Sequence, residues 1–97
     1  MASVYILYSE SINKFYIGYT TETVEKRLEK HNSGFYENKY TARGKPWQIF
    51  FELKCESAKQ AMAIEKHIKQ MKSSKYIKNL KQYPEMAIKL LEKYKTN

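Results

Sequence analysis

The chain has 97 residues, of which 42% are hydrophobic and 29% are charged, and its formal net charge is +8. This length suits one domain, residues 1–97, with a single core, and the composition is not that of a disordered chain. No apolar run approaches the roughly 20 residues that span a bilayer, and no signal peptide is evident, so we expect a cytoplasmic protein without a membrane partner. The single cysteine, Cys55, fits a reducing setting and is expected to act as a small buried hydrophobe.

The positive charge is concentrated in the second half of the chain. Residues 1–53 carry seven basic and six acidic side chains, whereas residues 54–97 carry eleven and four. Such an asymmetry indicates a polyanionic partner, although a lysine-rich surface that only confers solubility has the same composition.

Two aromatic, β-branched runs, residues 3–8 and 15–20, predict an antiparallel hairpin whose short polar connection contains the turn former Asn13. If Tyr8 pairs with Phe15, Tyr5 and Tyr16 lie on the same face as diagonal neighbours. Gly18 then stands opposite Tyr5, where the missing side chain leaves room for a substrate.

A helix is predicted from an N-cap at Thr21 to about Asn32, with Val24 and Leu28 on its apolar stripe. Arg27 and His31, four residues apart, share the neighbouring face at the border of the buried side.

Residues 35–46 are irregular, basic and aromatic, and residues 47–53 predict a third strand. Three helices are expected after it, at about residues 58–72, 75–82 and 85–95, the last beginning at Pro84. Glu65 lies at the edge of the apolar face of the first. The residues expected to point inward are Ala61, Ile64, Ile68 and Met71 in the first helix and Ala87, Ile88 and Leu91 in the last.

Several kinds of catalytic site are excluded by residue type. There is no glycine-rich phosphate loop and no zinc-ligand spacing, and the absence of aspartate removes a Ser/His/Asp hydrolase and two-metal sites built from aspartates. The two tyrosines, Arg27, His31 and Glu65 instead suit phosphodiester hydrolysis. Arginine neutralises phosphate oxygens, one glutamate can hold Mg²⁺ with water and phosphate as further ligands, and a phenol beside both cations can lose its proton.

The residues alone leave a structural interpretation open. Tyrosines in sheets usually pack, and Arg27 can pair with glutamates of its own helix. His31 near a helix C-terminus is favoured by the helix dipole, and Glu65 can be a solvated flank.

The order of these motifs resembles the GIY-YIG nuclease superfamily, in its small stand-alone bacterial branch, over roughly residues 3–81, with residues 83–95 as an additional C-terminal helix. Its two triplets correspond to Ser3-Val4-Tyr5, which keeps only the tyrosine, and to Tyr16-Ile17-Gly18. The segments EKRLEKHNSG, KYTARGKPW and AIEKHIKQMKSS look like the same branch. Tyr19 stands where some members carry lysine.

The resemblance implies an α+β fold in which helices flank a small three-stranded antiparallel sheet. It also implies one-metal endonucleolytic cleavage of DNA, in repair or on structured or single-stranded DNA. Tyr5 is then the first choice for the general base and Tyr16 the supporting phenol, while Arg27 binds the scissile phosphate. His31 assists proton transfer or positioning, and Glu65 holds Mg²⁺ or Mn²⁺. We expect all five side chains to converge on one electropositive surface.

The substrate implied by the resemblance is DNA, selected by the surface of the chain itself or by a targeting protein partner. The expected DNA contacts are Gly18, Lys39, Tyr40, Arg43, Lys45, Lys66, Lys69, Lys72, Lys75 and Lys78. Phosphate contacts of this kind give affinity without reading sequence. A catalytically weak or inactive nucleic-acid-binding module and a basic scaffold protein are the alternatives.

Overall fold

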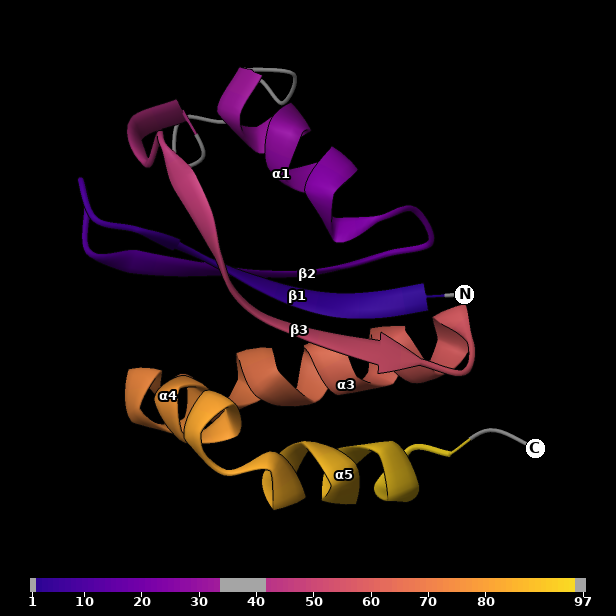
Figure 1. The fold of residues 1–97 in the computed structure, drawn as a ribbon. Coiled ribbons are helices and arrows are strands. Elements are labelled where there is room, and N and C mark those ends of the chain that lie inside the picture. The colour runs from indigo at the N-terminus through magenta and orange to yellow at the C-terminus, as the bar shows by residue number, and fades with distance from the viewer. Residues whose placement is uncertain (1, 34–41, 96–97) are drawn as a thin grey trace.

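The fold places a three-stranded sheet between helices, in an α+β arrangement (Figure 1). The structure, a computed structural model, describes residues 2–33 and 42–95. Its strands are β1 (Ala2–Ser9), β2 (Lys14–Thr20) and β3 (Trp47–Cys55), and its helices are α1 (Val24–Ser33), α3 (Ala58–Met71), α4 (Ser74–Gln82) and α5 (Pro84–Lys93). None of these helices is long and apolar enough to cross a membrane.

The sheet has the order β2-β1-β3, and both neighbouring pairs are antiparallel. In the hairpin Tyr8 pairs with Phe15 and Tyr5 with Gly18, so the predicted register is confirmed. Asn13, at the turn, has a φ of 51°, a conformation that asparagine tolerates better than most residues. The hairpin is therefore specified locally, by its strand pattern and its turn residue.

The pairing of β3 with β1 contains a β-bulge that the sequence analysis did not anticipate. Ile6 pairs with Phe51 and Leu7 with Ile49, which leaves Phe50 as the extra residue. Because side chains alternate along a strand, one extra residue reverses which face the residues before it occupy. Trp47 therefore faces the same side as Leu7, whereas Leu53 and Cys55 face the opposite side.

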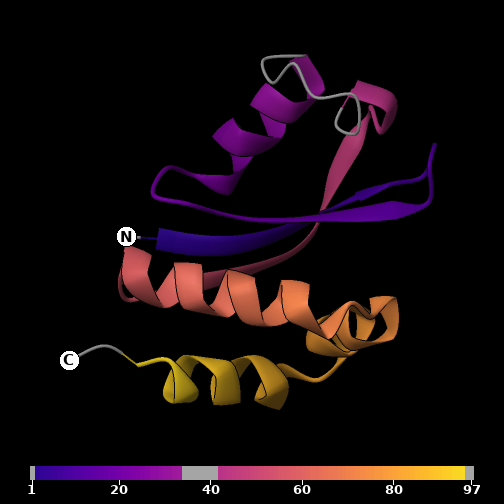
Figure 2. The ribbon, with the colours of Figure 1, turned by 180° about the vertical axis from the view of Figure 1, so that it is seen from behind.

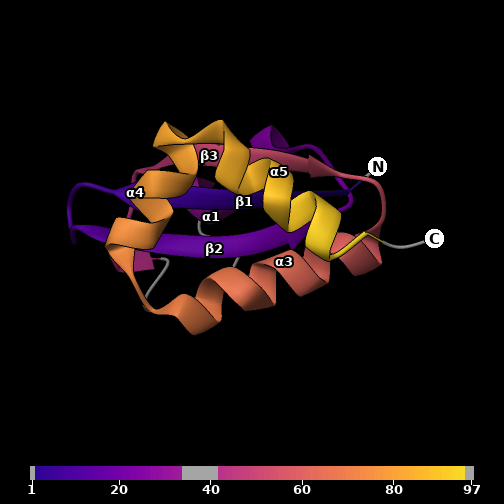
Figure 3. The ribbon, with the colours of Figure 1, turned by 90° about the horizontal axis from the view of Figure 1, so that it is seen from below.

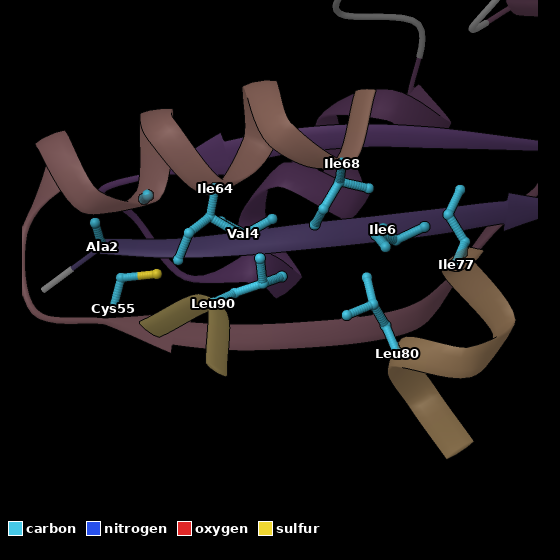
Figure 4. Packing of buried hydrophobic residues seen from close by; sticks show 10 residues of the cluster. Ala2, Val4, Ile6, Cys55, Ile64, Ile68, Ile77, Leu80 and Leu90 are labelled. Atoms are coloured by element: carbon cyan, nitrogen blue, oxygen red, sulfur yellow. The ribbon is translucent and has the colours of Figure 1, made fainter. Parts of the chain in front are cut away.

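Helix α1 covers one face of the sheet, and α3, α4 and α5 cover the other (Figures 1 and 2). On the α1 face a small cluster contains Tyr5, Leu7, Val24 and Trp47. The larger core lies on the opposite face, where residues of α3, α4 and α5 meet Ala2, Val4 and Ile6 of β1 (Figure 4). Seen from that side, α3 runs beside the edge strand β2 (Figure 3).

The helix boundaries follow from capping residues close in sequence. Ser57 and Ser73 accept hydrogen bonds from backbone N–H groups in the first turns of α3 and α4, and Pro84 stands in the first turn of α5. For α1 the predicted cap at Thr21 is wrong. Thr23 Oγ1 accepts a hydrogen bond from Lys26 N–H instead, because the chain is still turning away from β2 at Thr21.

The prediction that Met71 and Ile88 point inward is wrong. Met71 is 44% exposed, because α3 ends there, and Ile88 is 53% exposed, whereas Leu90 is buried in the core. The end of α5 is set by how it docks on α3. Gln60 Nε2 donates to the Leu91 carbonyl at 2.9 Å, a contact that periodicity cannot reveal. Cys55 is buried and unpaired, as expected, and burial raises the pKa of its thiol.

Candidate active site

The aromatic centre of the site is the pair Tyr5 and Tyr16 on the α1 face. Their ring centroids are 6.5 Å apart and their planes are inclined by 23°, so the rings are stacked. This follows from the register, which places Tyr16 opposite Leu7 and diagonal to Tyr5. Tyr5 is completely buried, whereas Tyr16 is half-buried. Only the Tyr16 side chain is therefore in contact with solvent.

The space beside the Gly18 backbone is filled by the Tyr5 ring and is not available to a substrate. A Cβ placed on Gly18 would lie 2.5 Å from the Tyr5 hydroxyl oxygen and 2.6 Å from Tyr5 Cζ. The space above this glycine is thus occupied by the tyrosine ring, and the expectation that a substrate approaches the backbone there is wrong. The glycine at position 18 shows in the sequence that a side chain is missing here, but the rotamer of Tyr5 decides what fills the space.

His31 closes the cluster from the last turn of α1. Its ring centroid lies 4.6 Å from that of Tyr16 in an edge-on contact and 6.1 Å from that of Tyr5. The Tyr5 hydroxyl is 3.3 Å from His31 Nε2, within hydrogen-bonding distance. His31 is only 2% exposed, so it acts inside the protein and not on bulk solvent.

Arg27 lies one helical turn before His31 on α1. Burial and the positive charge of Arg27 lower the pKa of His31 from 6.5 to about 4, so the imidazole is neutral at physiological pH. Arg27 also lines a hollow of about 390 Å³ with Tyr19, Thr20, Glu22 and Ala58. The Glu22 carboxylate is paired with Lys30 Nζ at 3.2 Å. The Arg27 guanidinium is therefore placed where an anion entering from the β2 edge would meet it.

The placement of β3 beside this cluster depends on two residues that the sequence analysis missed. Asn32 Nδ2 donates to the Trp47 carbonyl at 3.0 Å, and the Trp47 N–H donates to Asn32 Oδ1 at 2.6 Å. The Trp47 ring packs edge-on against Tyr16 at 6.1 Å. Asn32 directly follows His31, and Trp47 is the only tryptophan, but their pairing bridges 15 residues and has no local signal.

Glu65 lies apart from this aromatic cluster, on α3 at the opposite face of the sheet (Figures 1 and 2), so the expectation that all five side chains converge on one surface is wrong. It lines a hollow of about 400 Å³ with Tyr19, Met62 and Lys66, and its side chain is 18% exposed. Its carboxylate is 3.4 Å from Lys69 Nζ, one turn further along α3. Tyr19 lines both this hollow and that of Arg27, so the two hollows meet at the edge strand β2.

The donor set at Glu65 fits a weakly held divalent ion. Within residues 2–33 and 42–95, no three His, Cys, Asp or Glu side chains gather into a metal cluster. A single carboxylate facing an open hollow leaves most coordination positions to water and phosphate oxygens, which is typical of Mg²⁺ sites completed by a substrate. Lys69 is paired with this carboxylate in the structure, and a divalent ion would have to displace it.

Most of the expected DNA contacts that the structure describes are exposed. Lys66, Lys69 and Lys72 surround the Glu65 hollow, and Lys75 follows on α4. Arg43 and Lys45 lie beside the hairpin turn, where their carbonyls accept hydrogen bonds from Ser11 Oγ. Lys39 and Tyr40 lie outside the described residues.

A larger hollow, of about 570 Å³, lies away from these residues, between the end of β3 and α5. Its lining includes Cys55, Ile88 and Leu91, and its two lysines are balanced by two glutamates. We place the candidate site not here but at Tyr16, His31 and Arg27, because a half-buried phenol lies there against an imidazole, with a guanidinium one turn away on the same helix.

Comparison with known proteins decides the family. Residues 1–82 match the model of the GIY-YIG catalytic domain. The chain belongs to the GIY-YIG family. A UPF0213 protein of Syntrophus aciditrophicus (strain SB) is 34% identical over 86 residues, an alignment that covers 88% of this chain and 98% of that protein. No solved structure matches.

Membership in GIY-YIG places the chain in a family of nucleases, as its motifs indicated. The matched residues 1–82 contain every strand and the helices α1, α3 and α4, and therefore all five candidate catalytic residues. Helix α5 lies beyond the match and adds a cover to the larger core.

Proposed function

We propose that this protein is a divalent-metal-dependent DNA endonuclease that hydrolyses phosphodiester bonds in structured or single-stranded DNA, in the manner of a repair nuclease. The observation that supports it most strongly is the packed cluster of Tyr5, Tyr16 and His31, with Arg27 one turn away on the same helix. Membership in GIY-YIG supplies the reaction class. The buried, unpaired Cys55 fits a cytoplasmic setting.

Arg27 binds the scissile phosphate in this proposal. A guanidinium can donate two parallel hydrogen bonds to phosphate oxygens and stabilises the charge that develops on them in the transition state. Arg27 lines the hollow at the β2 edge together with Tyr19, so an anion that entered this hollow would lie beside it.

Tyr16 activates the attacking water. This reverses the order expected from the resemblance, in which Tyr5 came first, and the reason is exposure. A general base has to reach the water that it deprotonates, and Tyr5 is 0% exposed whereas Tyr16 is half-buried. Tyr5 and the neutral His31 hold the Tyr16 ring in place through stacking and edge-on contacts.

Glu65 is the one protein ligand for Mg²⁺ or Mn²⁺ in the proposal. A bound divalent ion supplies electrostatic stabilisation of the phosphate and lowers the pKa of nearby acids. With an ion on Glu65, Lys69 would no longer pair with the carboxylate and would be available, with Lys66 and Lys72, to contact the DNA backbone.

The experiment is cleavage of end-labelled duplex, single-stranded and branched DNA with Mg²⁺, with Mn²⁺ or with chelator. We expect metal-dependent cutting that falls about 10²- to 10³-fold in Arg27→Ala and Glu65→Gln, because each removes charge stabilisation from the transition state. Glu56→Gln, at an exposed glutamate outside the candidate site, is the matched control. We also expect Tyr16→Phe to lose more activity than Tyr5→Phe.

Two outcomes would overturn parts of the proposal. Salt-sensitive DNA binding without cutting in any condition would leave the catalytically inactive binding module as the function. Cutting that survives Glu65→Gln as well as it survives Glu56→Gln would remove Glu65 from the site.

A further inference from the structure

A second hollow with a composition suited to nucleic acid lies under the turn end of the hairpin. Its volume is about 290 Å³, and it opens on the face of the sheet opposite to Tyr16. Its lining includes three aromatic side chains and two lysines: Tyr8, Phe15, Phe50, Lys14 and Lys78.

Three aromatic rings form the floor of this hollow. The centroids of Tyr8 and Phe15 are 5.0 Å apart, as are those of Phe15 and Phe50, and each of these side chains is half-buried. Phe50 is the extra residue of the β-bulge. The bulge therefore contributes a ring to this floor while Phe51 occupies the regular position opposite Ile6.

One face of the Phe50 ring is covered by an ammonium group from the surface. Lys81 Nζ lies 4.6 Å from the ring centroid, and Lys81 is exposed. A flat group that took the place of this ammonium would stack on the ring and leave Lys81 free to pair with an anion.

The charges around the hollow have one sign. Lys14 and Lys78 line it, and among the lining residues that the structure describes there is no carboxylate. Lys75, Lys78 and Lys81 recur every third residue along α4, and all three are exposed. The ligand that fits is therefore anionic and carries a flat aromatic group, which is the chemistry of a nucleotide.

The base of a nucleotide bound in this hollow has to be unpaired. In a duplex both faces of a base are covered by its stacked neighbours, whereas every base of a single strand has a face to offer to an aromatic side chain. Phe15 and Tyr16 are consecutive residues, about 3.8 Å apart at Cα, on opposite faces of the edge strand β2. The hollow is thus next to the candidate active site along the chain, reached around the end of the hairpin.

We propose that this hollow binds an unpaired base of a DNA strand, stacked on Phe50 and bordered by the Phe15 ring, which is inclined to Phe50 by 70°, with Lys14, Lys78 and Lys81 on the flanking phosphates. The proposal rests on the proposed function in taking DNA as the ligand, and it deepens it by making single-stranded segments beside the cleavage point the preferred substrate.

The test measures binding in chelator, where no cleavage occurs, by fluorescence anisotropy at one fixed salt concentration. The two probes are a labelled thymidine oligomer and an abasic oligomer of the same length, which has the same charge but no bases. We expect Phe50→Leu to weaken binding of the thymidine oligomer about tenfold and to leave the abasic oligomer unchanged, because only stacking is lost.

Phe51→Leu is the matched control, since Phe51 is a half-buried neighbour outside the hollow. Lys78→Gln keeps the apolar packing and is expected to weaken both oligomers more than Lys89→Gln, at an exposed lysine of α5, does. If Phe50→Leu changes neither oligomer, or changes both equally, the stacking site is overturned. If Lys78→Gln and Lys89→Gln behave alike, the phosphate contacts are overturned.

The outcomes separate the two proposals. Base-dependent binding that needs Phe50, in a protein that never cuts, would support base binding in the hollow and refute the nuclease function. Metal-dependent cutting by a protein that binds both oligomers equally would support the nuclease function and refute base binding in the hollow.

Discussion

Individual side chains decide which tyrosine of the site can act. Tyr5 and Tyr16 are equivalent in the hairpin pattern, since both lie on the α1 face. Their surroundings differ, because Tyr5 fills the space over Gly18 and faces His31 Nε2, whereas Tyr16 is only half-buried. In the proposed mechanism Tyr5 is therefore a positioning residue for Tyr16.

The contact between Gly18 and Tyr5 gives a direct test at this scale. Gly18→Ala should lower the free energy of unfolding by about 1–3 kcal/mol, because the new methyl group would overlap the buried ring. Urea unfolding measures the loss. In a Tyr5→Leu background the same substitution should cost much less, since the ring is gone. Equal costs in the two backgrounds would show that the glycine is needed for another reason.

At the scale of elements, the bulge and the Asn32 contacts together bring β3 to the site. The bulge at Phe50 places Trp47 on the α1 face, and Asn32 then holds the Trp47 backbone to the end of α1. Without the extra residue, the alternation set by Phe51, Leu53 and Cys55 would carry Trp47 to the opposite face.

Asn32→Ala tests this junction. The substitution leaves the N–H and the carbonyl of the buried Trp47 without their side-chain partner, and each such group costs about 1–3 kcal/mol. We expect destabilisation in that range and a change in the emission of Trp47, the only tryptophan. Ser33→Ala, at an exposed neighbour on α1, is the control. A stable variant with unchanged emission would show that packing alone holds Trp47.

At the scale of the whole molecule, the two histidines couple folding to pH. The pKa of His31 falls from 6.5 to about 4 on folding, through burial and the charge of Arg27. Between these values the unfolded chain binds more protons, so acid favours unfolding. The contribution of His31 to the free energy of unfolding is therefore fully present above pH 6.5 and is lost as the pH falls towards 4. His67 contributes in the same direction, since burial and Lys93 lower its pKa too.

The expected size of the His31 contribution is on the order of 3 kcal/mol across this range. Urea unfolding of the wild type between pH 7.5 and 4.5 should show the decline, and His31→Gln should flatten it. His67→Gln is the comparison, at a histidine that bonds Tyr94 at 2.8 Å far from the tyrosine pair. An unchanged pH slope in His31→Gln would mean that His31 is not the group that titrates.

Much of the fold and part of the site follow from the sequence alone, because the signals are local. Strand alternation and the turn at Asn13 specify the hairpin register, and capping residues such as Ser57, Ser73 and Pro84 begin the helices. The helical spacing of Arg27 and His31 places them on one face without tertiary information.

Tertiary structure decides what depends on contacts between distant segments. The Tyr5 rotamer fills the space that Gly18 was expected to leave for a substrate, and the bulge reverses the face of Trp47. Glu65 reaches the same edge strand as Arg27, but from the opposite face. The physical reason is common to all three. Local propensity sets which way a side chain can point along its own strand or helix, whereas close packing against partners far along the chain sets what it meets there.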